Sequence, residues 1–167
     1  MGLGILGEAV AAVLTKMNYR VTGWSRSRKS LPGVRSYVGE PELLEFLSDA
    51  QILVVLLPLD ETTQHILNKG TLAQLPSGAC VINAGRGGLI HENDLLNALD
   101  KGHISGAALD VFETEPNIPS ELKTLENVVS YPHLGSATIE TRIAMGDTAI
   151  DNALAFFEVK DLPNKVV

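Results

Sequence analysis

The sequence predicts an α/β protein built on a doubly wound, mostly parallel sheet. Apolar runs of strand length alternate with helical patterns along the chain, which is typical of βαβ units. A glycine-rich turn opens the first helical run, and polar side chains follow later apolar runs, where open parallel sheets bind their ligands. With 167 residues, of which 45% are hydrophobic and 20% charged, the chain can bury the core of one globular domain.

Periodicity places the individual elements. The predicted strands are Arg20–Trp24, Ile52–Leu57, Ala79–Asn83, Gly106–Leu109 and Val128–Tyr131. Helical spacing of apolar residues predicts helices between them, at Glu8–Met17, Pro41–Leu47, Thr62–Leu67 and Glu92–Lys101. Pro41 suits a first helical turn, and Gly102 suits the position just after a helix. We assign residues 1–135 to the sheet domain and residues 136–167 to a C-terminal helix, Ile139–Phe157, with its tail.

Composition excludes several classes of function. A net charge of −7 leaves no basic field to attract nucleic acid, and 5% aromatic residues are too few for base stacking. Cys80 is the only cysteine, so an internal disulfide and a Cys-based metal cluster are excluded. His65, His91 and His103 share no metal-ligand spacing and are expected to be structural or on the surface. The apolar N-terminus lacks the basic region of a secretion signal, and Ile52–Leu57 is too short to span a bilayer, so we expect a cytoplasmic protein with no membrane partner.

The turn Gly2–Gly7 reads Gly-Leu-Gly-Ile-Leu-Gly, the pattern of a Rossmann dinucleotide-binding turn. Its first glycine permits a tight turn, the second lets the backbone approach a pyrophosphate, and the third lets the helix pack on a strand. The N-terminus of that helix attracts the phosphates. Such a pattern is weak by itself, but here it opens a helical run. The residues expected to bind a cofactor are therefore Gly2, Gly4, Ile5, Leu6 and Gly7.

The next predicted strand ends without the acidic residue that would hold the ribose of NAD. Ser25, Arg26, Ser27 and Arg28 stand there instead, in an otherwise acidic protein. A solvated loop would explain these charges equally well. A 2′-phosphate on the ribose favours a cofactor-binding role for this loop, because Arg and Ser donors would bind the phosphate and a carboxylate would repel it. We therefore expect NADP(H) as the cofactor, in preference to NAD(H).

Three later segments each deliver one polar side chain after an apolar run: Arg86 in INAGRGG, Glu115 in ALDVFETEP and His133 in YPHLGSAT. A guanidinium can hold a carboxylate with two parallel hydrogen bonds, and an imidazole can exchange a proton near neutral pH. A carboxylate can fix that imidazole's tautomer and favour its charged form. Taken singly, the Arg is more often a solvated turn and the Glu more often a loop residue. Together they predict a site that reduces a 2-oxo acid.

The sequences and the order of these segments resemble those of the D-isomer-specific 2-hydroxyacid dehydrogenases. The resemblance runs from Gly2 to about Val159 and rests on Asn83–Gly87, Glu115-Pro116 and Pro132–Gly135. Residues 24–29, Trp-Ser-Arg-Ser-Arg-Lys, are similar to the glyoxylate/hydroxypyruvate reductase branch. The resemblance implies a small 2-oxo or 2-hydroxy acid substrate and a homodimer in the full-length form.

The resemblance also implies roles for single residues. NADPH gives a hydride to the 2-carbon of glyoxylate or hydroxypyruvate, while His133 donates a proton to the oxygen. Glu115 orients His133, and Arg86 grips the substrate carboxylate and polarises the carbonyl. Pro58 lies where the family's chain passes over the adenine and ribose, although it could simply end a strand. Asp110 matches the aspartate that bonds the nicotinamide carboxamide, although it could simply start a turn.

The chain departs from the family at its beginning, because Met1 directly precedes the glycine turn that should follow a strand. We expect an N-terminally truncated Rossmann sheet that lacks its first strand, together with nearly all of the substrate-binding domain. We place the lost strand between Arg20–Trp24 and Ala79–Asn83 and expect these two strands to face a gap. Two other functions stay open: an NAD(P)-binding module without turnover, like the family's NAD(H)-sensing corepressors, and an inactive fragment.

Overall fold

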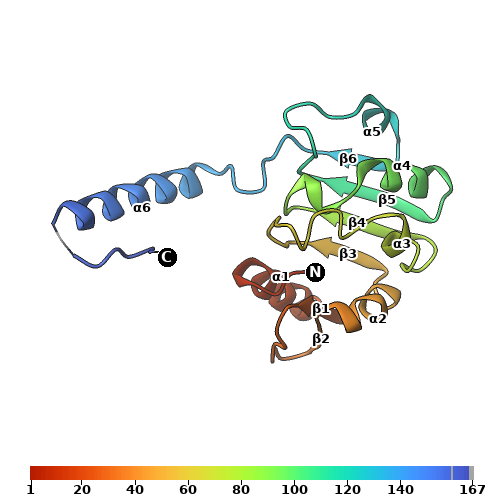
Figure 1. Ribbon diagram of the computed structural model, residues 1–167, viewed down its shortest axis with the longest axis horizontal. Helices are drawn as coiled ribbons and strands as arrows, with labels where there is room; N and C mark the ends of the chain where they lie inside the picture. The colour runs from red at the N-terminus through yellow and green to blue at the C-terminus, as the bar shows by residue number, and fades with distance from the viewer. Residues whose placement is uncertain (159, 166–167) are drawn as a thin grey trace. The chain divides into compact units, whose positions relative to one another are not determined.

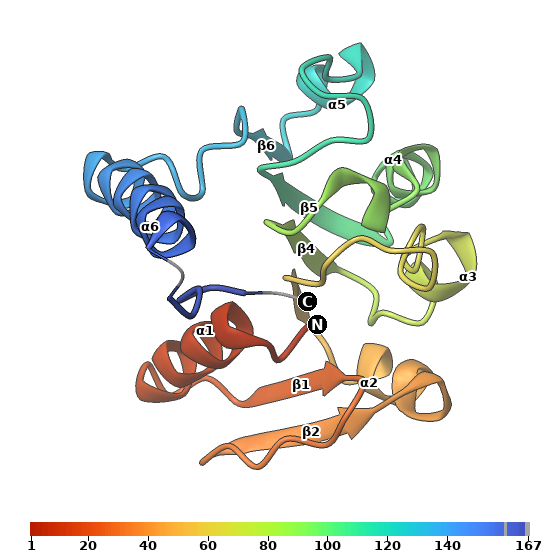
Figure 2. The same ribbon diagram turned by 60° about the vertical axis from the view of Figure 1, so that its left-hand side comes forward.

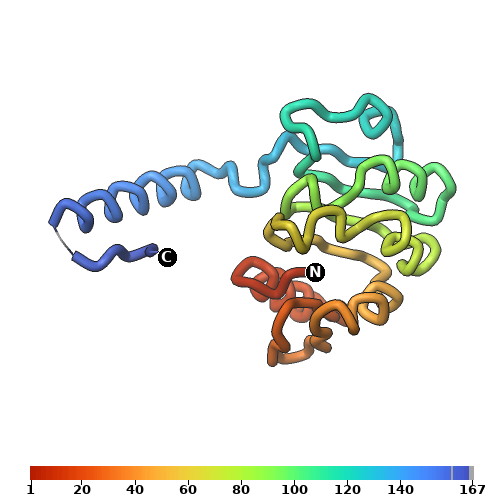
Figure 3. The backbone as a smooth tube through the Cα atoms, viewed as in Figure 1, coloured from red at the N-terminus to blue at the C-terminus, as the bar shows by residue number. Residues whose placement is uncertain are grey.

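The computed structural model describes residues 1–158 and 160–165. The chain divides into two compact units, Met1–Pro132 and His133–Val167, and each is described by itself. The first unit carries the sheet, and the second carries one long helix, α6 (Ile139–Phe157). Figure 1 labels the elements, and Figure 3 traces the backbone from the N-terminus in red to α6 in blue.

The first unit contains parallel strands in two hydrogen-bonded groups. One group pairs β1 (Val21–Ser25) with β2 (Val34–Val38). The other group contains, in pairing order, β3 (Ile52–Val55), β4 (Ala79–Asn83), β5 (Ile104–Leu109) and β6 (Val128–Ser130). The predicted α/β class with a parallel sheet is confirmed.

Helices flank these strands. They are α1 (Ile5–Lys16), α2 (Leu43–Ser48), α3 (Lys69–Leu72), α4 (Glu92–Asp100) and α5 (Ser120–Thr124), with 3-10 turns η1 (Glu40–Glu42) and η2 (Gly87–Leu89). Figure 2 shows α1 on one side of the strands and α2, α3 and α4 on the other. Burial alternates along β3 and β4, so one face of these strands is buried more deeply than the other. The apolar side chains of the central strands that are at most 2% exposed are Leu53, Val55, Ala79, Val81, Ile104 and Leu109.

Several predicted bounds agree closely with the structure. Both β4 and α6 have the predicted ends, and Gly102 follows α4 with a φ of 67°, as expected for the residue that ends a helix. The first helix begins at Ile5, three residues before the predicted Glu8, because the glycine turn leads straight into it. Pro41 lies in η1, so the predicted helix at Pro41–Leu47 divides into a 3-10 turn followed by α2.

The helix predicted at Thr62–Leu67 is wrong. The Asp60 carboxylate accepts hydrogen bonds from the backbone N–H groups of Thr62 (2.9 Å) and Thr63 (3.1 Å), and His65 has a φ of 50°. An Asp side chain that bonds the following amides favours a turn over a helix. The helix begins later, at α3, where the Asn68 side chain accepts from Gly70 N and caps it.

The strand β2 was not predicted. Its sequence, Val-Arg-Ser-Tyr-Val, alternates apolar and polar residues, but it is short and lies at the edge of the sheet. Gly33, with a φ of 74°, turns the chain into it. Edge strands expose one face and carry polar residues, so they lack the continuous apolar run by which the other strands were recognised. The short helix α5 was likewise not predicted.

The gap in the sheet exists, but one of its predicted neighbours is wrong. The strand β4 pairs on one side with β3 and on the other with β5, so β3 and not β4 faces β1 across the gap. The prediction failed because it omitted β2 and therefore shifted the strand order by one position. Met1 and Gly2 close one end of the gap: Leu56 N donates to Met1 O at 3.0 Å, and Gly2 N donates to Trp24 O at 2.8 Å.

The second unit is built on α6. Thr138 caps this helix, and its hydroxyl accepts from Thr141 N at 3.2 Å. Among residues 1–158 and 160–165, no helix is both long and apolar enough to cross a membrane.

Candidate active site

The glycine turn has the geometry that a pyrophosphate requires. Gly2 has a φ of 87°, and a Cβ at Gly7 would lie 1.8 Å from Gly2 O, so both positions exclude a side chain. A Cβ at Gly4 would meet nothing within 4 Å. Gly4 caps α1, whose first-turn N–H groups attract anions. The turn is therefore closed where the helix meets the strand and open where a phosphate would approach, which fits a dinucleotide.

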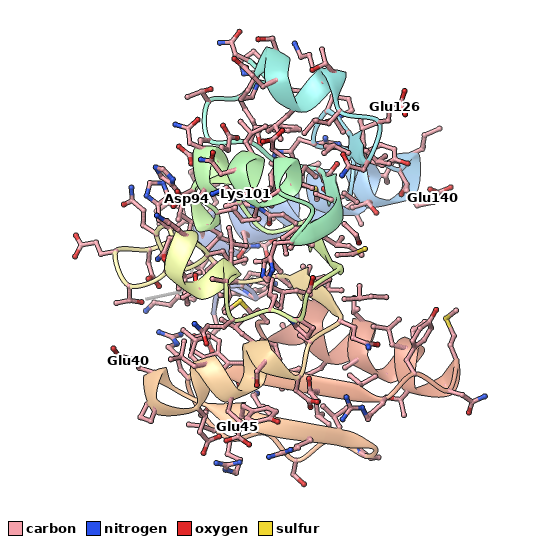
Figure 4. The ribbon with its side chains drawn as sticks, turned by 90° about the vertical axis from the view of Figure 1, so that its right-hand side faces the viewer. Glu40, Glu45, Asp94, Lys101, Glu126 and Glu140 are labelled. Atoms are coloured by element: carbon pink, nitrogen blue, oxygen red, sulfur yellow. The ribbon has the colours of Figure 1, made fainter. Side chains whose placement is uncertain are left out.

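A cavity of about 530 Å³ lies between the carboxyl ends of β1 and β3. It is lined by Ser25 and Arg26 after β1 and by Pro58 after β3, so three of the expected cofactor residues meet there. The Ser25 hydroxyl is turned inward and donates to Ser27 O at 2.8 Å, which shapes the loop. Glu40, labelled in Figure 4, contributes an acidic group to the same lining.

The expected cationic residues divide into bound and available groups. Arg28 pairs with Glu42 at 2.6 Å and donates to Ser36 O, and Lys29 pairs with Glu8 at 2.9 Å. The Val38 N–H and the Arg28 guanidinium lower the pKa of Glu42 and keep it charged. Arg26 is exposed and makes no hydrogen bond or ion pair with the part of the chain that the structure describes. Of the three cations Arg26, Arg28 and Lys29, Arg26 is therefore the one that is available to a ligand of this cavity.

Arg86 is held in a turn after β4. Asn83 is 1% exposed; its amide donates to Arg86 O at 3.0 Å, and its carbonyl oxygen accepts from Gly85 N at 3.1 Å. Arg86 itself is exposed, and its guanidinium donates to Gly85 O at 2.7 Å. Sequence reasoning missed the role of Asn83, although an Asn that ends an apolar strand before Gly-Arg-Gly is a turn signal.

The loop that carries Glu115 packs against the turn that carries Arg86. A Cβ at Gly87 would lie 1.9 Å from the carbonyl carbon of Phe112, so the two backbones are in direct contact. The Glu115 carboxylate accepts from Phe112 N at 3.0 Å. The structure therefore brings the segments of Arg86 and Glu115 together.

Two carboxylates that were not predicted anchor the Glu115 loop to α4. Glu92 N donates to Glu113 Oε1 at 2.9 Å, and Glu113 N donates to Glu92 Oε1 at 2.8 Å. Burial raises the pKa of Glu92, against the lowering effect of the Glu113 N–H. His65 approaches Glu113 at 3.4 Å, and His91 pairs with Asp94 (Figure 4) at 3.0 Å. No group of residues able to hold a metal is found within the described ranges.

The remaining predicted residues lie at the same sheet edge or in the second unit. Asp110 follows β5, and its backbone N–H donates to Asn83 O at 2.9 Å, which sets it beside the end of β4. His133 is the first residue of the second unit and has a φ of 55°. Its catalytic role stays a prediction.

Comparison with known proteins identifies the family. The model of the D-isomer specific 2-hydroxyacid dehydrogenase NAD-binding domain matches residues 1–135. The chain belongs to this family. The expected Rossmann-type NAD-binding domain is therefore present, and the resemblance seen in the sequence is confirmed.

Two similar members of the 2-hydroxyacid dehydrogenase family are glyoxylate/hydroxypyruvate reductases. Glyoxylate/hydroxypyruvate reductase A of Arabidopsis thaliana is 42% identical over 167 residues, which are 100% of this chain and 52% of the relative. The Salmonella heidelberg enzyme of that name is 47% identical over 140 residues, 83% of this chain and 45% of the relative. The chain spans about half the length of the curated relatives it matches.

A solved structure shows the same fold with a cofactor bound. An NADPH-dependent glyoxylate/hydroxypyruvate reductase from Sinorhizobium meliloti, in complex with NADP and malonate, is 34% identical with a TM-score of 0.94. The match covers 100% of this chain and 51% of that one. NADP is thus a cofactor of a close structural relative.

Proposed function

We propose that this chain is the cofactor-binding and catalytic part of an NADPH-dependent reductase that converts glyoxylate or hydroxypyruvate to the 2-hydroxy acid. The observation that carries the proposal is the contact of Gly87 with Phe112, which unites the Arg86 turn and the Glu115 loop. The open glycine turn and the cavity with Arg26 support NADPH as the cofactor. The names of the relatives support the substrate class.

Arg86 is the candidate that holds the substrate. Its guanidinium is exposed, while Asn83 fixes the backbone below it, so two parallel hydrogen bonds to a carboxylate are available. Holding the carboxylate places the 2-carbon for attack and polarises the carbonyl beside it. The hydride comes from the nicotinamide of NADPH when the cofactor is bound.

We assign His133 the role of proton donor to the oxygen that becomes the hydroxyl. We assign Glu115 the role of accepting the other ring N–H, which keeps the imidazolium charged at neutral pH. The Phe112 N–H already holds Glu115 as an acceptor, and the Glu92–Glu113 bonds steady the loop behind it. Asp110 is proposed to accept from the nicotinamide carboxamide.

Binding and turnover are tested separately. Fluorescence titration with NADPH measures cofactor affinity on this chain. Turnover is followed as substrate-dependent loss of NADPH absorbance, with the chain joined to the N-terminal half of the Sinorhizobium meliloti relative. Both glyoxylate and hydroxypyruvate should support turnover, because each carries the carboxylate and the adjacent carbonyl that Arg86 would engage.

Three variants test the roles. His133→Ala should lower kcat by roughly a hundredfold or more with unchanged NADPH affinity, and Arg86→Ala should also raise KM. Glu115→Gln should narrow the pH range of activity. Lys101→Ala, which removes an exposed charge on the far end of α4 (Figure 4), is the matched control. Near-normal turnover of the His133 variant would contradict the proposal.

A cofactor-binding module without turnover is the second candidate, because the open glycine turn and the cavity lined by Arg26 would serve cofactor binding alone equally well. NADPH binding without oxidation in the joined protein would select it. A cytoplasmic location and a homodimer of the full-length protein stay predictions.

A further inference from the structure

His65 has a backbone conformation that is unusual for a residue with a side chain. Its φ is 50°, in the left-handed region that favours glycine and costs other residues free energy. Two hydrogen bonds hold it there: the His65 N–H donates to Gly88 O at 2.8 Å, and Asn68 Nδ2 donates to His65 O at 3.0 Å. Strained residues that are held in this way often lie at functional positions. The contacts of the His65 side chain indicate what that function is.

The imidazole of His65 contacts both the cofactor cavity and the Glu115 loop. It lines the cavity to which Arg26 also contributes. Its Nε2 lies 3.4 Å from Glu113 Oε1, in the loop that carries Glu115. The side chains of His65 and Glu113 are 35% and 28% exposed, so water screens their interaction only in part. His65 therefore connects the wall of the cavity directly to the loop.

Glu113 in turn fixes the position of Glu115. The Glu113 carboxylate accepts from Glu92 N at 2.9 Å, and the Glu113 N–H donates to Glu92 Oε1 at 2.8 Å. The residue before it, Phe112, donates its N–H to the Glu115 carboxylate at 3.0 Å. A shift of Glu113 would therefore move the amide that holds Glu115.

Carboxylates surround the His65 ring on several elements. Behind Glu113 lies Glu92, whose pKa is raised by burial and by the charge of Glu113, against the lowering effect of the Glu113 N–H. The His91 ring meets the His65 ring edge to face at 5.0 Å, and His91 Nδ1 lies 3.0 Å from Asp94 Oδ2. The other charged residues of the cavity lining are Arg26, Glu40 and Asp60. A charged imidazole at His65 would offset the repulsion between Glu92 and Glu113.

The contact between His65 and Glu113 has room to shorten. Its 3.4 Å exceeds the roughly 2.7–2.9 Å of a hydrogen bond between a charged N–H donor and a carboxylate. Imidazoles gain their proton between about pH 8 and about pH 5. Within the described residues, Glu113 forms its ion pair with this imidazole and not with a lysine or arginine. The charged ring would thus be the cationic partner of Glu113.

We propose that His65 is a positioning residue, which connects the wall of the cofactor cavity to the Glu115 loop through Glu113 and holds that loop more firmly when its ring is protonated. This inference rests on the proposed function for the roles of the cavity and of Glu115, whereas the contact between His65 and Glu113 is independent of that function. A cofactor that binds against His65 would order the Glu115 loop in advance, and such ordering lowers the cost of binding the substrate.

Hydrogen exchange on this chain tests the connection without turnover. NMR measures the protection of the Phe112 and Glu113 amides, corrected for intrinsic exchange, at about pH 6 and about pH 8. In the unaltered chain the protection should be about threefold higher at the lower pH, as expected for a partly exposed ion pair. His65→Gly removes the ring at a φ that glycine adopts freely, so protection should fall at the lower pH and lose its pH dependence.

Two further variants separate the charge of the ring from its shape. His65→Lys is charged at both pH values and should keep the protection high at both. Glu113→Gln retains an oxygen for Glu92 N but lacks the negative charge, so it should lose the pH dependence. The matched control is His103→Gln, which alters a part-buried histidine whose Nε2 lies 3.1 Å from Leu72 O. This control should leave the protection of the two amides and its pH dependence unchanged.

The inference is overturned if His65→Gly protects the two amides as well as the unaltered chain does. It is also overturned if that variant keeps the pH dependence, which would then belong to His91 or Glu92. Loss of protection in His65→Lys would overturn the role of the charge.

NADPH addresses the connection to the cavity. It should raise the protection of both amides in the unaltered chain but not in His65→Gly, and an equal rise in both proteins would overturn this connection. Failure of NADPH to bind the unaltered chain would count against the proposed function, while the pH dependence of exchange would still decide the role of His65.

Discussion

Two glycines of the same turn should respond oppositely to alanine. At Gly7 a Cβ would lie 1.8 Å from Gly2 O, so α1 must move by more than an ångström away from backbone that cannot yield. Overpacking of this kind costs about 1–3 kcal/mol, and the better helix propensity of Ala recovers only part of it. At Gly4 nothing lies within 4 Å and φ is −81°, which Ala adopts readily. Gly4→Ala should therefore cost less than about 1 kcal/mol, mainly as a poorer helix cap.

The two variants should affect different properties: Gly7→Ala mainly the stability of the protein, and Gly4→Ala mainly its affinity for NADPH. Gly7→Ala should lower Tm by about 4–8 °C, since 1 kcal/mol corresponds to about 2–4 °C for a chain of this size. Gly4→Ala should shift Tm by less than about half as much, yet abolish NADPH binding because its methyl group occupies the space of the pyrophosphate. Calorimetry and NADPH titration measure the two effects. An unchanged NADPH affinity of Gly4→Ala would refute the placement of the phosphates.

Three further predictions concern the cofactor, the Arg86 turn and pH. Arg26→Ala should weaken NADPH binding by about tenfold or more and leave NADH binding unchanged, whereas Lys101→Ala should change neither; equal loss for both cofactors would contradict a 2′-phosphate contact. Asn83→Ala removes two hydrogen bonds from a buried side chain and should cost about 2–3 kcal/mol in urea unfolding, whereas Asn97→Ala, at an exposed site on α4, should cost little. In a polypeptide that begins at Met1, the amino group titrates near pH 8 when the chain is unfolded and near pH 5 when it is folded. The unfolded state therefore binds more protons between these values, and stability should fall by up to about 4 kcal/mol as pH drops from 8 to 5. Acetylation of that amino group should flatten the slope, and an unaltered slope would place its origin elsewhere.

Local patterns in the sequence were sufficient for the fold class and for much of the site. The apolar runs of β3, β4 and β5 mark parallel strands of the sheet, and each strand contributes residues to the buried core. The turn Gly2–Gly7 could be recognised because each glycine meets a steric requirement that no other residue meets. Arg26 and Pro58 were expected to share one site, and both line the same cavity.

Contacts between distant segments could not be read from such patterns. Asn83 could be recognised as a turn residue, but its sequence context does not show that its amide bonds the backbone of Arg86. Nothing near Glu92 indicated its exchange of hydrogen bonds with Glu113. Sequence periodicity also predicted a helix at Thr62–Leu67, where the Asp60 side chain stabilises a turn. Side-chain bonds to backbone compete with helix formation, and periodicity does not record them.

The sequence by itself determined the class of the fold, the cofactor turn and the chemical character of the candidate residues, because these depend on local periodicity, on backbone freedom and on side-chain type. Only the tertiary structure decided which strands are neighbours. The gap in the sheet lies between β1 and β3, and not between β1 and β4 as predicted. Arg28 pairs with Glu42, whereas Arg26 is available. Strand order and ion pairing depend on which distant segments come into contact. The edge strand β2 is too polar to be recognised from a run of apolar residues, so its place in the sheet could not be inferred from the sequence.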